Sequence, residues 1–385
     1  MRGMILAPGV FLAGVAIFLI VLWDAFEAII LPRRVTRRFR LTRFYYLFTW
    51  RTWKLYARLL PSAKTRETFF GFFGPISLFF LIGVWAVGLV LSFGMMQYGA
   101  GSAVNVSGMT PSLYTDLYLS GTTFFTLGLG DVIPKSGLAR FLVVAEAGFG
   151  FGFLAAVIGY LPFIYGAFGN RETNIALLDA RAGTPPTAGE LLRRHSYKGG
   201  EEALQKLLAE WERWCAQLLE SHLSYPVLAY FRSQHDNQSW VASLTAILDT
   251  CALVIAGLED ACSKQAELTF AIARHAVVDL CQVFSAPPRP LSTDRLTPET
   301  LEKLRAKLAK HGWVLLTTPE AAQRLTELRE MYEPYVHALA RHLNHSLPPW
   351  IPEKKGRDNW ETTAWAKTSG VMDDNPTQLL HDDHF

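Results

Sequence analysis

Apolar residues are distributed unevenly along the chain, and their pattern predicts a membrane half followed by a water-soluble half. Three long apolar runs fill the first part, at Ile5–Leu31, Phe69–Tyr98 and Leu138–Phe168. Each is long enough to cross a bilayer of roughly 30 Å as a helix that rises 1.5 Å per residue. We therefore expect three transmembrane helices.

A fourth apolar segment, Ser112–Phe125, lies between the second and third runs. It is too short to cross a bilayer, but it suits a re-entrant helix, which is tolerated where protein buries it or where it lines water. Thr110 and Pro111 precede it, and a hydroxyl N-cap followed by proline is a helix-start signal. The sequence thus predicts a short helix that enters the membrane and returns.

The loop between the first two runs is strongly basic and predicts the orientation of the chain. Residues 33–68 are rich in Lys and Arg, with Glu67 as the one acid. Positively charged loops stay on the cytoplasmic side. We therefore expect the N-terminus and residues 99–137 outside and everything after Gly169 inside. Asp24 and Glu27, near the inner end of the first run, are expected to pair with Arg33, Arg34, Arg37 or Arg38.

Aromatic residues are interleaved with the basic ones in residues 33–68. Such a mixture can indicate nucleic-acid binding. Beside a membrane it favours an interfacial helix with aromatic anchors and anionic-lipid contacts, and we expect no nucleic-acid partner.

The polar remainder of the chain predicts helices and no strands, so the fold class is all-α. Apolar residues recur at helical spacing, 3.6 residues per turn, in five segments: Glu201–His222, Ser239–Leu258, Lys264–Phe284, Pro298–His311 and Pro319–His345. The predicted domains are an N-terminal transmembrane helix (1–32), a basic aromatic cytoplasmic or interfacial segment (33–68), a pore domain (69–168), a linker (169–188), a helical cytoplasmic domain (189–350) and a polar tail (351–385).

Composition and charge add little to this picture. The chain has 385 residues, a formal net charge of +3 and four cysteines, all in the polar half. The cysteines have no paired spacing of the zinc-site kind, so we expect reduced, buried thiols. The histidines show no metal-site spacing, and the acid–base residues show no catalytic grouping. We expect no metal other than filter cations and no enzymatic activity.

The segment after the short helix carries the chemistry. A cation that crosses hydrocarbon needs its hydration shell replaced, and a row of backbone carbonyls can do this. Glycine permits the conformations that such a row requires. A threonine hydroxyl can add an oxygen at the inner end, and a carboxylate at the outer mouth attracts cations. These parts occur in that order in the predicted filter, which consists of Thr126, Leu127, Gly128, Leu129, Gly130 and Asp131.

This arrangement resembles the potassium-channel pore-loop family, over about residues 69–168, with an additional span in front. The family pattern is Thr-Val-Gly-Tyr-Gly-Asp. The resemblance implies a homotetramer with potassium ions in the filter as the only bound group, in a bacterial inner membrane. The sequence departs from the family at Leu129, where an aromatic ring usually braces the filter, and at Thr122 and Phe125. A weakly selective cation channel therefore stays an alternative, as does a membrane-anchored signalling or scaffold protein with a vestigial pore.

The third run contains further candidates. Glu146 is an acid within the membrane, and such acids usually have a partner or a role. We expect it to support the filter together with Thr122 or Thr123. The candidates for a gating hinge are residues that can let a helix bend or kink, and they are Gly148, Gly150, Gly152 and Pro162. The glycines suit a gating bend and close helix packing equally well.

Overall fold

The computed structural model of the chain describes residues 7–31, 40–102, 104–106, 111–234, 238–258, 262–288, 294–352 and 358. The fold is helical, which confirms the predicted all-α class. The chain forms two compact units. The first comprises Met1–Pro61 and Phe72–Gly166, and the second comprises Ser62–Gly71 and Ala167–Phe385.

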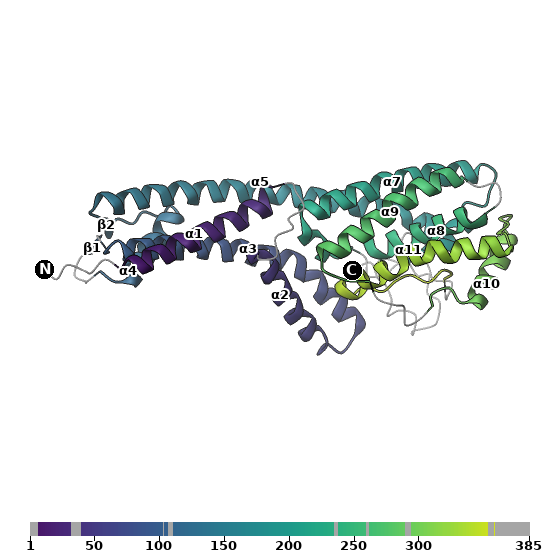
Figure 1. The fold of residues 1–385 in the computed structure, drawn as a ribbon, viewed down its shortest axis with the longest axis horizontal. Coiled ribbons are helices and arrows are strands. Elements are labelled where there is room, and N and C mark those ends of the chain that lie inside the picture. The colour runs from purple at the N-terminus through teal and green to yellow at the C-terminus, as the bar shows by residue number, and fades with distance from the viewer. Residues whose placement is uncertain are drawn as a thin grey trace, which may run out of the picture. The chain divides into compact units, whose positions relative to one another are not determined.

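The first unit contains the three predicted long helices (Figure 1), α1 (Pro8–Ile29), α3 (Ala63–Gly99) and α5 (Gly137–Ala182). All three are long and apolar enough to cross a membrane. Both α3 and α5 extend beyond the predicted runs, and each contributes residues to both units.

Small residues bring α1 and α3 close together. A Cβ atom added to Gly14 would lie 2.7 Å from the carbonyl oxygen of Ser92, and one added to Gly99 would lie 2.4 Å from the backbone nitrogen of Phe11. Both distances are too short for a side chain, so glycine is what allows this approach. Close packing through small residues is typical of helix pairs in membranes.

A buried carboxylate of α1 positions the next helix, α2 (Leu41–Ala57). The N-cap residue of α2, Arg40, has no side-chain cap. Asp24 takes this role, because its carboxylate accepts the Thr42 N–H at 3.1 Å. It also accepts the Trp85 indole N–H at 2.9 Å. A carboxylate is favourable at a helix N-terminus, where backbone N–H groups have no helical partner.

Glu27 also has local partners in the first unit. It accepts the Trp23 indole N–H at 2.6 Å and pairs with Arg40 at 3.3 Å. The partners that the sequence favoured for these two acids, Arg33, Arg34, Arg37 and Arg38, lie outside the described residues.

The second unit is a helical assembly that contains α6 (Ala188–Arg194), α7 (Gly200–Ser224), the 3-10 turn η1 (Pro226–Tyr230), α8 (Trp240–Gly257), α9 (Ser263–Val283), α10 (Pro298–Ala309) and α11 (Pro319–Leu343). Helix α9 packs against α7, α8 and α11. Helix α8 is also apolar enough to cross a membrane, but 89% of its apolar window is buried within the chain. It is therefore the core helix of this unit.

Several helix starts in this unit follow directly from the sequence. Thr297 and Thr318 are N-caps whose hydroxyls each accept a backbone N–H, and proline occupies the first helical position after both. The Ser239 hydroxyl likewise accepts a backbone N–H at the start of α8. Because these local signals fix the starts, the predicted bounds of α8, α10 and α11 agree with the structure to within a few residues.

The segment expected to be a linker, residues 169–188, differs from the prediction. Helix α5 continues through it to Ala182, and Thr187 caps α6. The boundary between the units falls after Gly166 instead. The prediction ended the third apolar run at Phe168 and placed a linker at residues 169–188, although the apolar spacing continues through Ile175 and Leu178, which are both buried.

Helix α6 is tied to α10 by a cluster of charges. Glu190 accepts hydrogen bonds from Arg193 and Arg194, each at 2.9 Å, and pairs with Lys307 of α10 at 3.3 Å. Burial alone would raise the pKa of Glu190. The bonds from Arg193 and Arg194 and the charge of Lys307 outweigh burial and lower that pKa from 4.5 to about 2.

We expect Glu190→Gln to lower the melting temperature of the second unit by a few degrees at neutral pH, because it removes charge-assisted hydrogen bonds. Since the pKa of Glu190 is lowered in the folded state, its contribution is present above pH 4.5 and is lost as the pH falls through about 2. The difference from wild type should therefore shrink over that range in fluorescence melts. The control is Glu299→Gln, which removes an exposed ion pair with Lys303 and should change little.

Candidate functional site

The predicted re-entrant segment forms α4 (Leu113–Phe124) in the first unit. Its N-cap is Ser112, whose hydroxyl accepts the Thr115 N–H at 3.4 Å. The cap that the sequence suggested, Thr110, lies outside the described residues. The helix ends directly before the predicted filter, and a helix C-terminus carries a partial negative charge that favours a nearby cation.

The first part of the filter folds back onto the end of α4 through backbone hydrogen bonds. The Thr126 N–H donates to the Thr123 carbonyl at 3.0 Å. The Leu127 and Gly128 N–H groups donate to the Thr122 carbonyl at 2.7 and 3.3 Å. In a planar trans peptide, the N–H and the preceding C=O point in opposite directions. The carbonyls of Phe125, Thr126 and Leu127 therefore point away from α4.

Backbone angles continue this arrangement along the filter. Thr126, Gly128 and Gly130 have φ values of +59°, +53° and +79°, whereas Leu127 and Leu129 do not have positive φ. In an ordinary strand, successive carbonyls alternate between two sides. Alternating signs of φ turn them toward one side instead. Glycine adopts positive φ without steric cost, which explains why it stands at two of the three positions.

The outer mouth of the filter is held by two further contacts. The Tyr118 hydroxyl of α4 lies near the Asp131 carboxylate. The strand β2 (Val132–Pro134), which follows the filter, pairs in antiparallel fashion with β1 (Val104–Val106). Both strands were missed by the sequence reading, because three residues are too few to show alternation. Tyr118 was not singled out either, since only the fold brings it to Asp131.

The buried acid Asp116 steadies the pore helix. Asp116 is fully buried, and its carboxylate accepts a hydrogen bond from the Ser102 hydroxyl. This pair connects α4 to the turn that follows α3. No sequence pattern pointed to it, because the two residues belong to different elements.

Glu146 is fully buried, but its partner is not one of those predicted. Its carboxyl group hydrogen-bonds the Ser120 hydroxyl of α4, and that hydroxyl also lies 2.7 Å from the Val90 carbonyl of α3. Through Ser120, the pore helix α4 is thereby connected to both α5 and α3. Thr122 and Thr123 contact the filter through their backbone carbonyls, and the Thr122 hydroxyl bonds the Leu119 carbonyl at 3.0 Å.

The glycines of α5 differ in their surroundings. A Cβ atom on Gly150 would lie 2.4 Å from the Phe124 carbonyl oxygen, at the end of the pore helix. Gly148 and Gly152 have nothing within 4 Å of such an atom in the single chain. Helix α5 runs unbroken through these glycines and past Pro162. At Gly150 the structure supports the packing interpretation, and a gating bend at any of the four positions stays a prediction.

Two buried arginines hold the ends of α5 and α3 that belong to the second unit. Arg171 of α5 donates to the carbonyls of Leu228 at 2.9 Å and Phe231 at 2.8 Å, and burial lowers its pKa. Arg232, on the same loop, pairs with Glu67 of α3 at 3.1 Å. The sequence pattern singled out neither arginine.

Comparisons with known proteins agree with this reading of the first unit. Residues 78–162 match the model of a family described as "Ion channel". The uncharacterized membrane protein YdjJ of Bacillus subtilis (strain 168) is 26% identical over 182 residues, which cover 46% of this chain and 51% of the relative. The chain thus spans about half the length of that curated relative. No solved structure matches the chain.

The family match confirms the predicted resemblance of the pore domain to the potassium-channel pore-loop family. It covers most of α3, all of α4 and the filter, and α5 as far as Pro162. Together with the apolar helices and the membrane-protein relative, it places the chain among membrane proteins.

We expect Gly150→Ala to destabilise the first unit, because the new methyl group collides with a backbone carbonyl that cannot rotate away. Overpacking of this kind costs about 1–3 kcal/mol. Gly148→Ala and Gly152→Ala are the matched controls, and they should be neutral or slightly stabilising because alanine favours helix over glycine. Thermal melts of the detergent-solubilised protein measure the difference. Equal melting temperatures for all three variants would contradict the packing role.

Proposed function

We propose that the chain is one subunit of a tetrameric cation channel whose filter is formed by Thr126–Gly130, with Asp131 at the outer mouth. The orientation of the filter backbone is the observation that carries this proposal. Amides 126–128 bond to the pore helix, so the preceding carbonyls are directed away from it. A row of carbonyls that faces one side can replace the water around a cation.

The exposure of the filter supports the tetrameric assembly. In the single chain, Phe125, Leu127 and Leu129 are each 60–64% exposed. Apolar side chains beside an ion path need protein or lipid against them, since large exposed apolar patches mark interaction surfaces. Copies of the same chain around a rotation axis would supply this cover and would complete the ring of carbonyls.

Selectivity for potassium over sodium is a separate proposal. Leu129 offers no hydroxyl that could brace the filter from behind. The approach of the Tyr118 hydroxyl to Asp131 and the pairing of β1 with β2 steady the outer end instead. We propose that these contacts preserve a preference for potassium.

Reversal potentials of the channel in planar bilayers, measured with potassium on one side and sodium on the other, test the preference. We expect a shift toward the potassium equilibrium potential. A reversal potential near zero under these bi-ionic conditions would indicate the alternative, a weakly selective cation channel suggested by Leu129.

Ion conduction itself is tested by Gly128→Ala in liposome flux assays. Alanine at φ +53° is strained by about 1–2 kcal/mol in every filter strand. We therefore expect flux to fall at least tenfold while the protein still assembles. Gly9→Ala is the control, because a Cβ atom there meets nothing within 4 Å. If wild type carries no cation flux, and Gly128→Ala behaves like wild type in cells, the protein is better explained as a membrane-anchored signalling protein with a vestigial pore.

We also propose that the second unit gates the pore. The inner helix α5 continues into that unit, where Arg171 is buried. The first turns of α3 belong to it as well, and Glu67 there pairs with Arg232. Arg171 binds the loop around η1 and Arg232 belongs to that loop, so a movement of the loop would act on both α5 and α3.

The lipid contacts and the orientation are part of the proposal. Helix α2 exposes aromatic residues such as Phe44 and Phe48 alongside Arg43, Arg51 and Lys54. This composition suits an interfacial helix that contacts anionic lipids on the cytoplasmic side of a bacterial inner membrane. The N-terminus would then lie outside and the second unit in the cytoplasm.

A further inference from the structure

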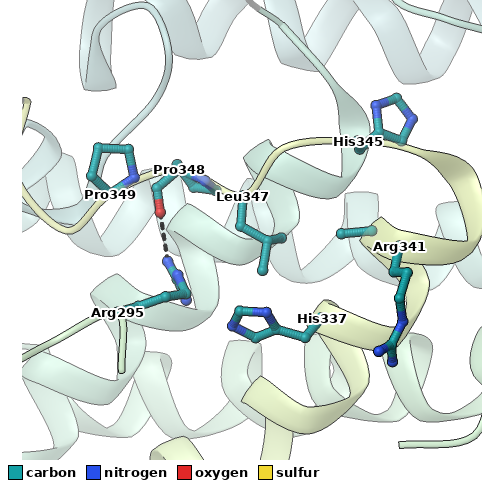
Figure 2. A pocket seen from close by; sticks show the side chains of 8 residues that line it. Arg295, His337, Arg341, His345, Leu347, Pro348 and Pro349 are labelled. Atoms are coloured by element: carbon teal, nitrogen blue, oxygen red, sulfur yellow. Dashed lines mark hydrogen bonds between the residues drawn. The ribbon is translucent and has the colours of Figure 1, made fainter. Parts of the chain in front are cut away.

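The second unit contains a cavity of about 470 Å³ at the end of α11 (Figure 2). This volume lies within the range of small-molecule sites, roughly 300–1,000 Å³. Four basic or titratable side chains line the cavity, and they are Arg295, His337, Arg341 and His345. The described residues that line the cavity include no acid, although two acids behind the wall, Asp249 and Glu333, pair with Arg295.

Arg295 is held rigidly in this wall. Its guanidinium donates to Asp249 at 2.5 Å and to the Pro348 carbonyl at 2.8 Å, as the dashed line in Figure 2 shows for Pro348. The side chain is only 8% exposed. Its Nε–H is buried and has no hydrogen-bond partner within the described part of the chain. A buried donor of this kind is costly to leave unsatisfied.

His337 provides a second such group. Its Nε2 atom is buried and has no hydrogen-bond partner among the residues that the structure describes. Figure 2 shows the ring between Arg295 and Arg341. Burial lowers the pKa of His337 to about 4, and the charges of Arg295 and Arg341 add to the shift. The same positive field that opposes a charged imidazole would stabilise an anion.

Arg341 completes the set at the rim of the cavity. It is exposed and forms no ion pair with any residue described in the structure. A guanidinium binds carboxylate and phosphate oxygens in a bidentate fashion. Water could satisfy the Arg295 and His337 nitrogens, and an anion would in addition pair with the exposed charge of Arg341.

We propose that this cavity binds a small anion that carries phosphate or carboxylate oxygens. The Arg295 Nε–H and His337 Nε2 bind the oxygens, and Arg341 balances the charge. This site is independent of the proposed ion conduction, because its groups all belong to the second unit.

The full chain in neutral-lipid nanodiscs tests the proposal by isothermal titration calorimetry at constant ionic strength. The soluble probes are inorganic phosphate and citrate, and dihexanoyl phosphatidate tests whether the oxygens come from a lipid headgroup. We expect at least one probe to bind, and Arg341→Gln and His337→Gln each to weaken it about tenfold or more, as for the loss of a charge-assisted hydrogen bond. The matched control is Arg324→Gln on the same helix, whose side chain is 53% exposed and pairs with Glu327.

The outcomes distinguish a soluble anion from a lipid headgroup as the source of the bound oxygens. Binding of phosphate or citrate that is lost in the two variants supports a soluble anion, and binding of phosphatidate alone supports a headgroup. If no probe binds at millimolar concentration, the cavity holds water only and the proposal is wrong. Binding that persists unchanged in both variants while their melting temperatures match wild type would place any anion elsewhere, which also overturns it. The assay needs no ion flux, so its result does not depend on the channel proposal.

Discussion

A backbone within hydrocarbon has no water to bond with, so each amide must find a partner in the protein. At the end of α4 this constraint has a direct consequence. The last carbonyls of the helix accept the first amides of the filter, and the trans peptide then turns the filter carbonyls away from the helix. The free carbonyls face one side because the amides of the same peptides already donate to the helix carbonyls. A single set of hydrogen bonds thus both satisfies the helix end and leaves free the row of carbonyls that we propose as cation ligands.

Buried acids hold the helices of the first unit together. Asp24 caps α2 from α1, Asp116 bonds the turn after α3 through Ser102, and Glu146 reaches Ser120 of α4. Each carboxyl group is almost fully buried, and each joins elements that are distant in sequence. A polar group in an apolar surrounding is costly without a partner, which makes such contacts selective for one arrangement of helices. The apolar surfaces between helices provide less discrimination, because lipid is as apolar as they are.

The second unit uses buried arginines in a similar way. Arg171 and Arg232 both bury their charged groups around one loop, and Arg295 does so between Asp249 and Pro348. Guanidinium groups have several fixed donors, so they can join carbonyls and carboxylates from several segments at once. The helices of this unit are thereby connected through their loops as well as through the apolar core around α8.

The sequence by itself determined most of the helices and pointed to the proposed filter segment. Hydrophobic runs, helix caps and the Gly-x-Gly-Asp pattern depend on neighbouring residues, and local rules suffice to read them. The pore helix, α8, α10 and α11 therefore agree closely with their predictions, whereas α3 and α5 extend beyond the predicted runs. Tertiary structure alone decided which side chains meet. Ser120 became the partner of Glu146, Tyr118 reached Asp131, Gly150 met Phe124, and α5 continued through the expected linker. These outcomes depend on how helices pack against one another, and a contact between distant segments leaves no periodic trace in one sequence.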